Sequence, residues 1–98
     1  LKDGQVDVSV GFATDGRIKG FNLVTLEDDK QFFPAYNAAP VVRSEVLEKY
    51  EGLEELLNEL SSHLSSETMT ELNYLVDVEH KDVAEVAREW LKSQNLID

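Results

Sequence analysis

The stretch Asp29–Arg43 sets the strongest limit on the fold of this chain. It contains Pro34 and Pro40, and a proline cannot donate a backbone hydrogen bond to a neighbouring strand. The stretch therefore cannot be an uninterrupted central strand, and we expect an extended crossing segment. Patterns typical of strands precede it, whereas patterns typical of helices run from it to the last residue.

Two strands are expected before the crossing segment. Val6, Val8 and Val10 alternate with polar residues, which is typical of a strand with one buried face. A turn is expected over residues 14–17, and a second strand over residues 21–26. Because parallel strands need partners, a chain with only two clear strands is natural as the end of a larger α/β protein.

Four helices are expected after the crossing segment. The first is short, with Ser44 as its N-cap and its end near Gly52. The third starts after Ser65 or Ser66, and the last starts near Asp82. The second helix has the clearest apolar stripe, formed by Leu53, Leu56, Leu57, Leu60 and Leu64.

The composition excludes several classes of function. The chain has 98 residues, enough for one modest core, and its 20 acidic and 9 basic side chains give a net charge of −11. Such a chain is unsuited to nucleic acid, whose phosphates need lysine and arginine, and to anionic membrane surfaces. There is no cysteine, and no apolar run is long enough to span a membrane.

No group of residues in the sequence predicts catalysis, a metal site or a cofactor. The two histidines, His63 and His80, lie in different predicted elements and have no cysteine partner. Gly16 and Gly20 lack the spacing of a phosphate-binding loop. The serines have no base placed near them, and the carboxylates are typical of solvated helix faces. We therefore predict that the chain is not an enzyme.

Two aromatic residues, Phe12 and Tyr36, occupy unusual positions. Phe12 comes just after the first predicted strand, where ligands of open α/β sheets bind. Tyr36 lies between the two prolines of the crossing segment, where a ring can project into a cleft. Aromatic faces attract cations, and a caged quaternary ammonium group is the recurring functional use. Ordinary packing is the alternative for both rings.

Several stretches of the sequence resemble one known family. They are Gly4–Gly16, which contains Thr-Asp-Gly, and Leu26–Val42, which contains Asp-Asp-Lys, Phe-Phe-Pro, Tyr and Ala-Pro in that order. Met69–Tyr74 and Val83–Leu91 are similar to the family's closing helices. The resemblance is to the C-terminal third of the osmoprotectant-binding proteins. These are the extracytoplasmic substrate-binding components of ABC importers for glycine betaine, choline, carnitine and related compounds.

The resemblance implies the fold class: an α/β fragment of a two-lobed, type II periplasmic-binding-protein-like fold, with short β segments followed by about four helices. Residues 1–30 would end the second lobe. Residues 31–43 would form the crossing between lobes. Residues 44–98 would supply the C-terminal helices of the first lobe.

The resemblance also implies the ligand-binding residues. Members of the family hold a trimethylammonium group in a cage of aromatic rings, and two cage positions match Phe12 and Tyr36. The family usually has tyrosine at the position of Phe12, so this chain keeps the ring face and lacks the hydroxyl there. The family often has a second proline where this chain has Ala35. The other cage rings would lie upstream of Leu1, so the preferred osmoprotectant does not follow from this sequence.

The function implied by the resemblance is delivery of ligand to an ABC permease outside the cytoplasm. The protein would be fused to the permease, lipid-anchored at the cell membrane beside it, or periplasmic. No cofactor and no nucleic acid is implied as a partner. Exposed lobe surface would allow the fragment to form a homodimer.

Two alternatives remain open. One is the effector-binding domain of a transcription regulator with the same two-lobed fold, which an upstream helix-turn-helix would favour. The other is a helical interaction domain that docks a protein partner and binds no small ligand. This second alternative predicts that Phe12→Ala and Tyr36→Ala leave ligand binding unchanged.

Overall fold

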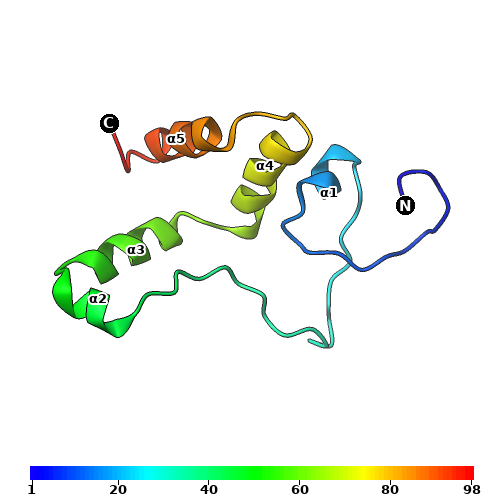
Figure 1. Cartoon of the computed structure of the whole chain (residues 1–98). Helices are drawn as coiled ribbons and strands as arrows, with labels where there is room; N and C mark the ends of the chain where they lie inside the picture. The colour runs from blue at the N-terminus through cyan, green and yellow to red at the C-terminus, as the bar shows by residue number, and fades with distance from the viewer. The chain divides into compact units, whose positions relative to one another are not determined.

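A computed structural model describes all of residues 1–98 and contains five α-helices (Figure 1). The chain divides into two compact units. Unit 1 comprises Leu1–Leu26 and Ser65–Asp98, and unit 2 comprises Glu27–Leu64. The helices are α1 (Gly16–Gly20), α2 (Ser44–Lys49), α3 (Leu53–Ser62), α4 (Ser66–Asp77) and α5 (Val83–Ser93).

Unit 1 is organised around α4, which packs against both α1 and α5. The α1–α4 contact depends on a glycine, because a Cβ atom built on Gly16 would lie 2.4 Å from the backbone nitrogen of Tyr74. Gly20, at the other end of α1, faces the side chain of Val78. Two glycines therefore let the backbone of this short helix approach α4 closely.

The starts of α4 and α5 follow from local sequence. The Ser65 hydroxyl accepts a hydrogen bond from the Thr68 amide at 3.1 Å, and the Asp82 carboxylate accepts one from the Glu85 amide at 3.0 Å. Both bonds satisfy amides that have no partner within the helix. The predicted starts of these two helices are confirmed. Val86 of α5, 4% exposed, is the one buried hydrophobic side chain.

Unit 2 contains the crossing segment and the helices α2 and α3. The predicted helix of leucines is confirmed as α3, which follows Gly52 in the left-handed conformation at φ 83°. The prediction that Ser44 caps α2 is wrong, since Arg43 takes that position and no side chain caps the helix. Neither helix contains a fully buried residue. None of the five helices is long and apolar enough to cross a membrane.

The chain forms no strand, so the two strands expected over residues 6–10 and 21–26 are absent. A strand needs a neighbour for its backbone groups, and residues 5–11 make no backbone-to-backbone hydrogen bond. The turn expected over residues 14–17 is replaced by the start of α1, because the Asp15 carboxylate caps that helix. Phe21, expected in the second strand, ends α1 instead.

Candidate functional site

Phe12 lies in unit 1, directly before the loop that leads into α1. Its carbonyl oxygen accepts a hydrogen bond from the Asp15 amide at 3.1 Å, which closes a tight turn. The residue is 72% exposed. The turn therefore fixes the backbone of a largely exposed aromatic residue.

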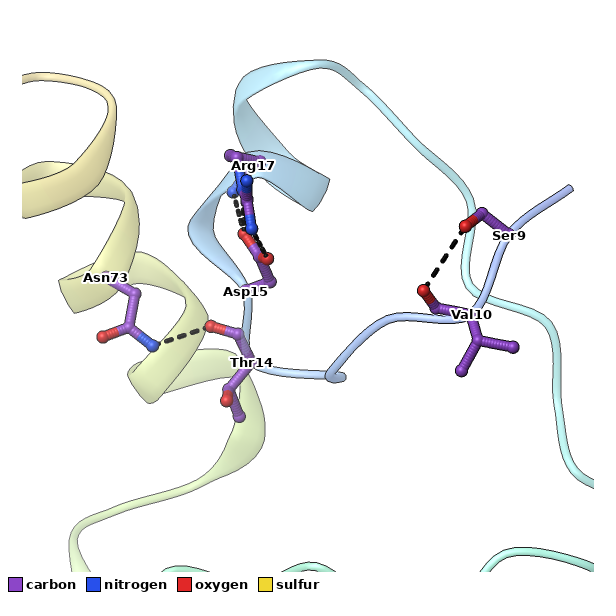
Figure 2. A network of polar contacts seen from close by, with 6 residues as sticks. All are labelled: Ser9, Val10, Thr14, Asp15, Arg17 and Asn73. Carbon is purple, nitrogen blue, oxygen red and sulfur yellow. Dashed lines mark hydrogen bonds and ion pairs between the residues drawn. The ribbon is translucent and has the colours of Figure 1, made fainter. Parts of the chain in front are cut away.

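The two residues after Phe12 are tied to α4. The Asn73 side-chain amide donates to the Thr14 carbonyl at 2.7 Å, as Figure 2 shows. The Thr70 hydroxyl shares its hydrogen between the Ser66 carbonyl of its own helix at 2.8 Å and the Ala13 carbonyl at 3.3 Å. Both donors come from α4, so the position of the Phe12 loop is coupled to that helix. Asn73 is not identifiable from the sequence, because nothing local distinguishes a helical asparagine whose side chain bonds to a distant loop.

Asp15 and Arg17 form a second set of bonds at the start of α1 (Figure 2). One Asp15 oxygen accepts from the Arg17 backbone amide and from Nε, each at 2.9 Å, and the other accepts from Nη2 at 2.6 Å. These bonds favour the charged carboxylate. The Arg17 side chain, followed by its backbone amide, lowers the pKa of Asp15 from 3.8 to about 2.

The pKa of Asp15 predicts how α1 responds to acid. Because the folded chain binds this proton more weakly, the carboxylate stabilises α1 above pH 3.8 and loses that effect as the pH falls through about 2. A titration of the Asp15 carboxyl carbon by NMR should give a midpoint near 2. Arg17→Ala should move the midpoint part of the way back, since the amide of residue 17 still donates. A midpoint of 3.8 in the unchanged chain would contradict the assignment.

A shallow hollow beside the Phe12 loop is lined by residues that include Ala13, Lys19 and Glu71. The Lys19 ammonium is paired with the Glu71 carboxylate and also lies 4.7 Å from the centre of the Tyr74 ring. The positive charge in this hollow is therefore already satisfied within the protein. The charged pair in this hollow therefore serves to hold α1 against α4, and the hollow is not a candidate ligand site.

Tyr36 lies in unit 2, within the part of the crossing segment that forms no helix or strand. The residue is 78% exposed. The segment begins at a well-defined turn, where the Asp28 carboxylate accepts hydrogen bonds from the amides of Phe32 at 3.0 Å and Phe33 at 2.8 Å. These bonds, with Phe33 the larger cause, lower the pKa of Asp28. Gln31 adopts a left-handed φ of 52° within the turn.

Asp28 is the organising residue of the turn at the start of the crossing segment. The role of Asp28 does not follow from the sequence, because its hydrogen-bond partners lie four and five residues further along the chain. Phe12 belongs to unit 1 and Tyr36 to unit 2, and their participation in one ligand cage stays a prediction. No group of three or more histidine, cysteine or acidic residues is arranged to hold a metal ion.

Comparison with known families gives a match over nearly the whole chain. The family model described as the substrate binding domain of ABC-type glycine betaine transport systems matches residues 1–93. This match includes Phe12, the α1–α4 contact and the complete crossing segment with Tyr36.

Curated relatives agree with this match. The chain is 42% identical over 98 residues to the carnitine transport binding protein OpuCC of Listeria monocytogenes, and 43% identical over 98 residues to a glycine-betaine-binding protein of Pseudomonas aeruginosa. Each alignment covers 100% of this chain and 32% of the relative. Over 85 residues, or 87% of this chain and 15% of the relative, it is 42% identical to the ergothioneine transport permease/ergothioneine binding protein EgtU of Helicobacter pylori.

A solved structure confirms the predicted fold class. A crystal structure of a glycine betaine/carnitine/choline ABC transporter protein matches with a TM-score of 0.90 and 41% identity. The match covers 100% of this chain and 36% of that chain. The chain therefore spans about a third of the length of OpuCC, of the Pseudomonas aeruginosa protein and of the protein in the crystal structure.

Proposed function

Because the chain belongs to the family of substrate-binding domains of ABC-type glycine betaine transport systems, we propose that it is the C-terminal part of an osmoprotectant-binding protein. The family match over residues 1–93 carries this proposal. The ligands would be small quaternary ammonium compounds: glycine betaine, choline or carnitine. The family consists of transporter components and not of enzymes, so the prediction that the chain is not an enzyme is confirmed.

The proposed role of Phe12 and Tyr36 is to hold the cation of the ligand. Both residues are largely exposed. Phe12 begins a turn that its own carbonyl closes, and Tyr36 follows a turn that the Asp28 carboxylate closes. A cation over an aromatic face gains about 0.5–1 kcal/mol at an exposed site and about 2 kcal/mol when water is excluded. Closing a two-lobed protein over the ligand would provide that exclusion, so cation binding would favour the closed state. Further rings from the remainder of the protein would complete the cage.

The proposed partner is an ABC permease, and the proposed location is extracytoplasmic. One relative, EgtU, is named both as a permease and as a binding protein, which supports a fused arrangement as one form of this partnership. A lipid anchor beside a separate permease and a free periplasmic protein are the other two forms. In each of them the binding protein delivers ligand and performs no chemistry on it.

Calorimetric titration of the full-length protein tests the proposed function. Glycine betaine, choline, carnitine and ergothioneine would each be titrated, and at least one should bind with a stoichiometry of one. The neutral compound 3,3-dimethyl-1-butanol has the shape of choline without its charge. It should bind much more weakly than choline if choline is a ligand, because a neutral group gains no cation–π attraction. Absence of binding by all four charged ligands would overturn the proposal.

A further inference from the structure

Asn73 makes the shortest polar contact between α4 and the loop that follows Phe12. Its side-chain amide donates to the Thr14 carbonyl at 2.7 Å, and both residues are half-buried (Figure 2). The other contact is weaker, because the Thr70 hydroxyl lies closer to the Ser66 carbonyl of its own helix, at 2.8 Å, than to the loop, at 3.3 Å. Asn73 therefore supplies most of the polar attachment of this loop to α4.

The turn that follows Phe12 connects this attachment to the aromatic residue. The Phe12 carbonyl accepts from the Asp15 amide at 3.1 Å, so residues 12–15 form one hydrogen-bonded turn. Thr14 lies inside that turn, and Gly16, directly after it, is buried against the backbone of α4. One end of the turn is thus held by α4, and Phe12 begins the other end. A change in the position of Thr14 is therefore expected to move the backbone of Phe12.

An asparagine is well suited to this contact with a carbonyl group. Its amide is a neutral donor, so it pairs with the Thr14 carbonyl without leaving a half-buried charge. An ionised aspartate has nearly the same shape and can only accept, so it would place a carboxylate against the carbonyl oxygen. Asn73→Asp therefore removes the hydrogen bond and keeps the volume of the side chain.

We propose that Asn73 is a positioning residue of the ligand site: it holds the Thr14 carbonyl, and thereby the backbone from which the Phe12 ring projects, without contacting the ligand. The inference rests on the proposed function, and in particular on the role proposed for Phe12 in holding the cation. A residue that is held in place before the ligand arrives need not be ordered on binding, which lowers the cost of binding. Loss of the Asn73 bond should therefore reduce affinity through Phe12.

Hydrogen exchange in the full-length protein without ligand tests the attachment itself. The Asp15 amide, whose bond to the Phe12 carbonyl closes the turn, should exchange about tenfold faster in Asn73→Ala and in Asn73→Asp than in the unchanged protein. Amides inside α5 are the internal reference and should keep their rates. Unchanged exchange of the Asp15 amide in both variants would overturn the inference, whatever the protein binds.

A double-mutant cycle in the full-length protein tests the effect on binding. Glycine betaine, choline and carnitine would each be titrated calorimetrically, and the one that binds most tightly would be used. Asn73→Ala should weaken its binding about three- to tenfold, because the loss cannot exceed that of removing the Phe12 ring, which is about tenfold. Asn73→Ala should add no further loss to Phe12→Ala, whereas it should add its full loss to Tyr36→Ala.

The cycle separates positioning of Phe12 from general damage to the fold. If Asn73 only stabilised the fold, Asn73→Ala would cause the same loss in the Phe12→Ala and Tyr36→Ala backgrounds, and that result would overturn the inference. Full affinity in Asn73→Ala, where Phe12→Ala does weaken binding, would also overturn it. Absence of binding by the unchanged protein would overturn the proposed function, and this inference with it.

Two further variants serve as controls. Asn58→Ala removes an exposed asparagine of α3 and should leave both the affinity and the exchange of the Asp15 amide unchanged. Thr70→Val keeps the shape of the side chain and should have a smaller effect than Asn73→Ala, because the Thr70 hydroxyl lies closer to its own helix than to the loop. A larger effect of Thr70→Val would contradict the assignment of the attachment to Asn73.

Discussion

Tyr36→Ala in the full-length protein is expected to weaken binding of its quaternary ammonium ligand about 30-fold. The substitution removes one ring from the proposed cage, and a desolvated cation–π contact is worth about 2 kcal/mol, which corresponds to that ratio. Tyr36 is 78% exposed, so its truncation leaves no cavity in the packing of this chain. Calorimetric titration with the ligand that binds most tightly measures the effect.

The controls separate the ring face from the tyrosine hydroxyl and from general surface change. Tyr36→Phe keeps the face and should bind within a few-fold of the unchanged protein. Tyr50→Ala removes another exposed tyrosine of unit 2 and should have no effect on affinity. Phe12→Ala should weaken binding about tenfold, and Phe12→Tyr should preserve it. If Tyr36→Ala and Phe12→Ala both bind as well as the unchanged protein, the cage assignment is wrong and the helical interaction alternative gains support.

Gly16→Ala is expected to separate α1 from α4. The added Cβ would lie 2.4 Å from the Tyr74 nitrogen and 2.6 Å from the Asn73 carbonyl carbon, and these backbone atoms cannot rotate away. Overpacking of this kind costs about 1–3 kcal/mol. Alanine is a better helix former than glycine by about 1 kcal/mol, which offsets part of the cost and does not remove the clash. The net result should be a displaced or frayed α1.

NMR of the 98-residue chain measures this effect through the Asn73 side-chain amide, whose bond to Thr14 should be lost. Gly11→Ala is a suitable control, because a Cβ at Gly11 meets nothing within 4 Å. Gly20→Ala should have a smaller effect than Gly16→Ala, since its Cβ would meet a Val78 methyl group at 3.0 Å and a side chain can adjust. An unchanged Asn73 signal in Gly16→Ala would contradict this prediction and would show that α4 can move to make room for the added Cβ.

The helices were predictable where local sequence determines them. The leucine spacing of α3 and the caps at Ser65 and Asp82 each involve residues within a few positions of one another. By contrast, α1 has only five residues, two of which are glycine. Its position depends on α4, more than 40 residues away in the sequence. A sequence pattern over neighbouring residues cannot predict the contact between α1 and α4.

The strand predictions were wrong, and the residues that anchor the candidate site were not predicted, because both depend on contacts with distant or absent partners. The valine pattern correctly identifies side chains suited to a strand, whereas strand pairing depends on a partner that no residue of this chain supplies. Phe12 and Tyr36 were selected by their positions and by resemblance to a family. The bonds from Asn73 and Asp28 that hold the two loops required coordinates, because a hydrogen-bonding side chain does not reveal its partner in sequence.

Unit 1 is assembled from both ends of the chain, with the whole of unit 2 inserted between them. Docking α1 on α4 therefore requires closure of a long loop, although each doubling of loop length adds only about 0.6 kcal/mol to the entropic cost. Contacts between distant residues slow folding more than they weaken the folded state. During synthesis α1 emerges before α4, so the contact between these two helices cannot form until α4 has been made. The loop that carries Phe12 thus acquires its anchor only after α4, which supplies Asn73, has left the ribosome.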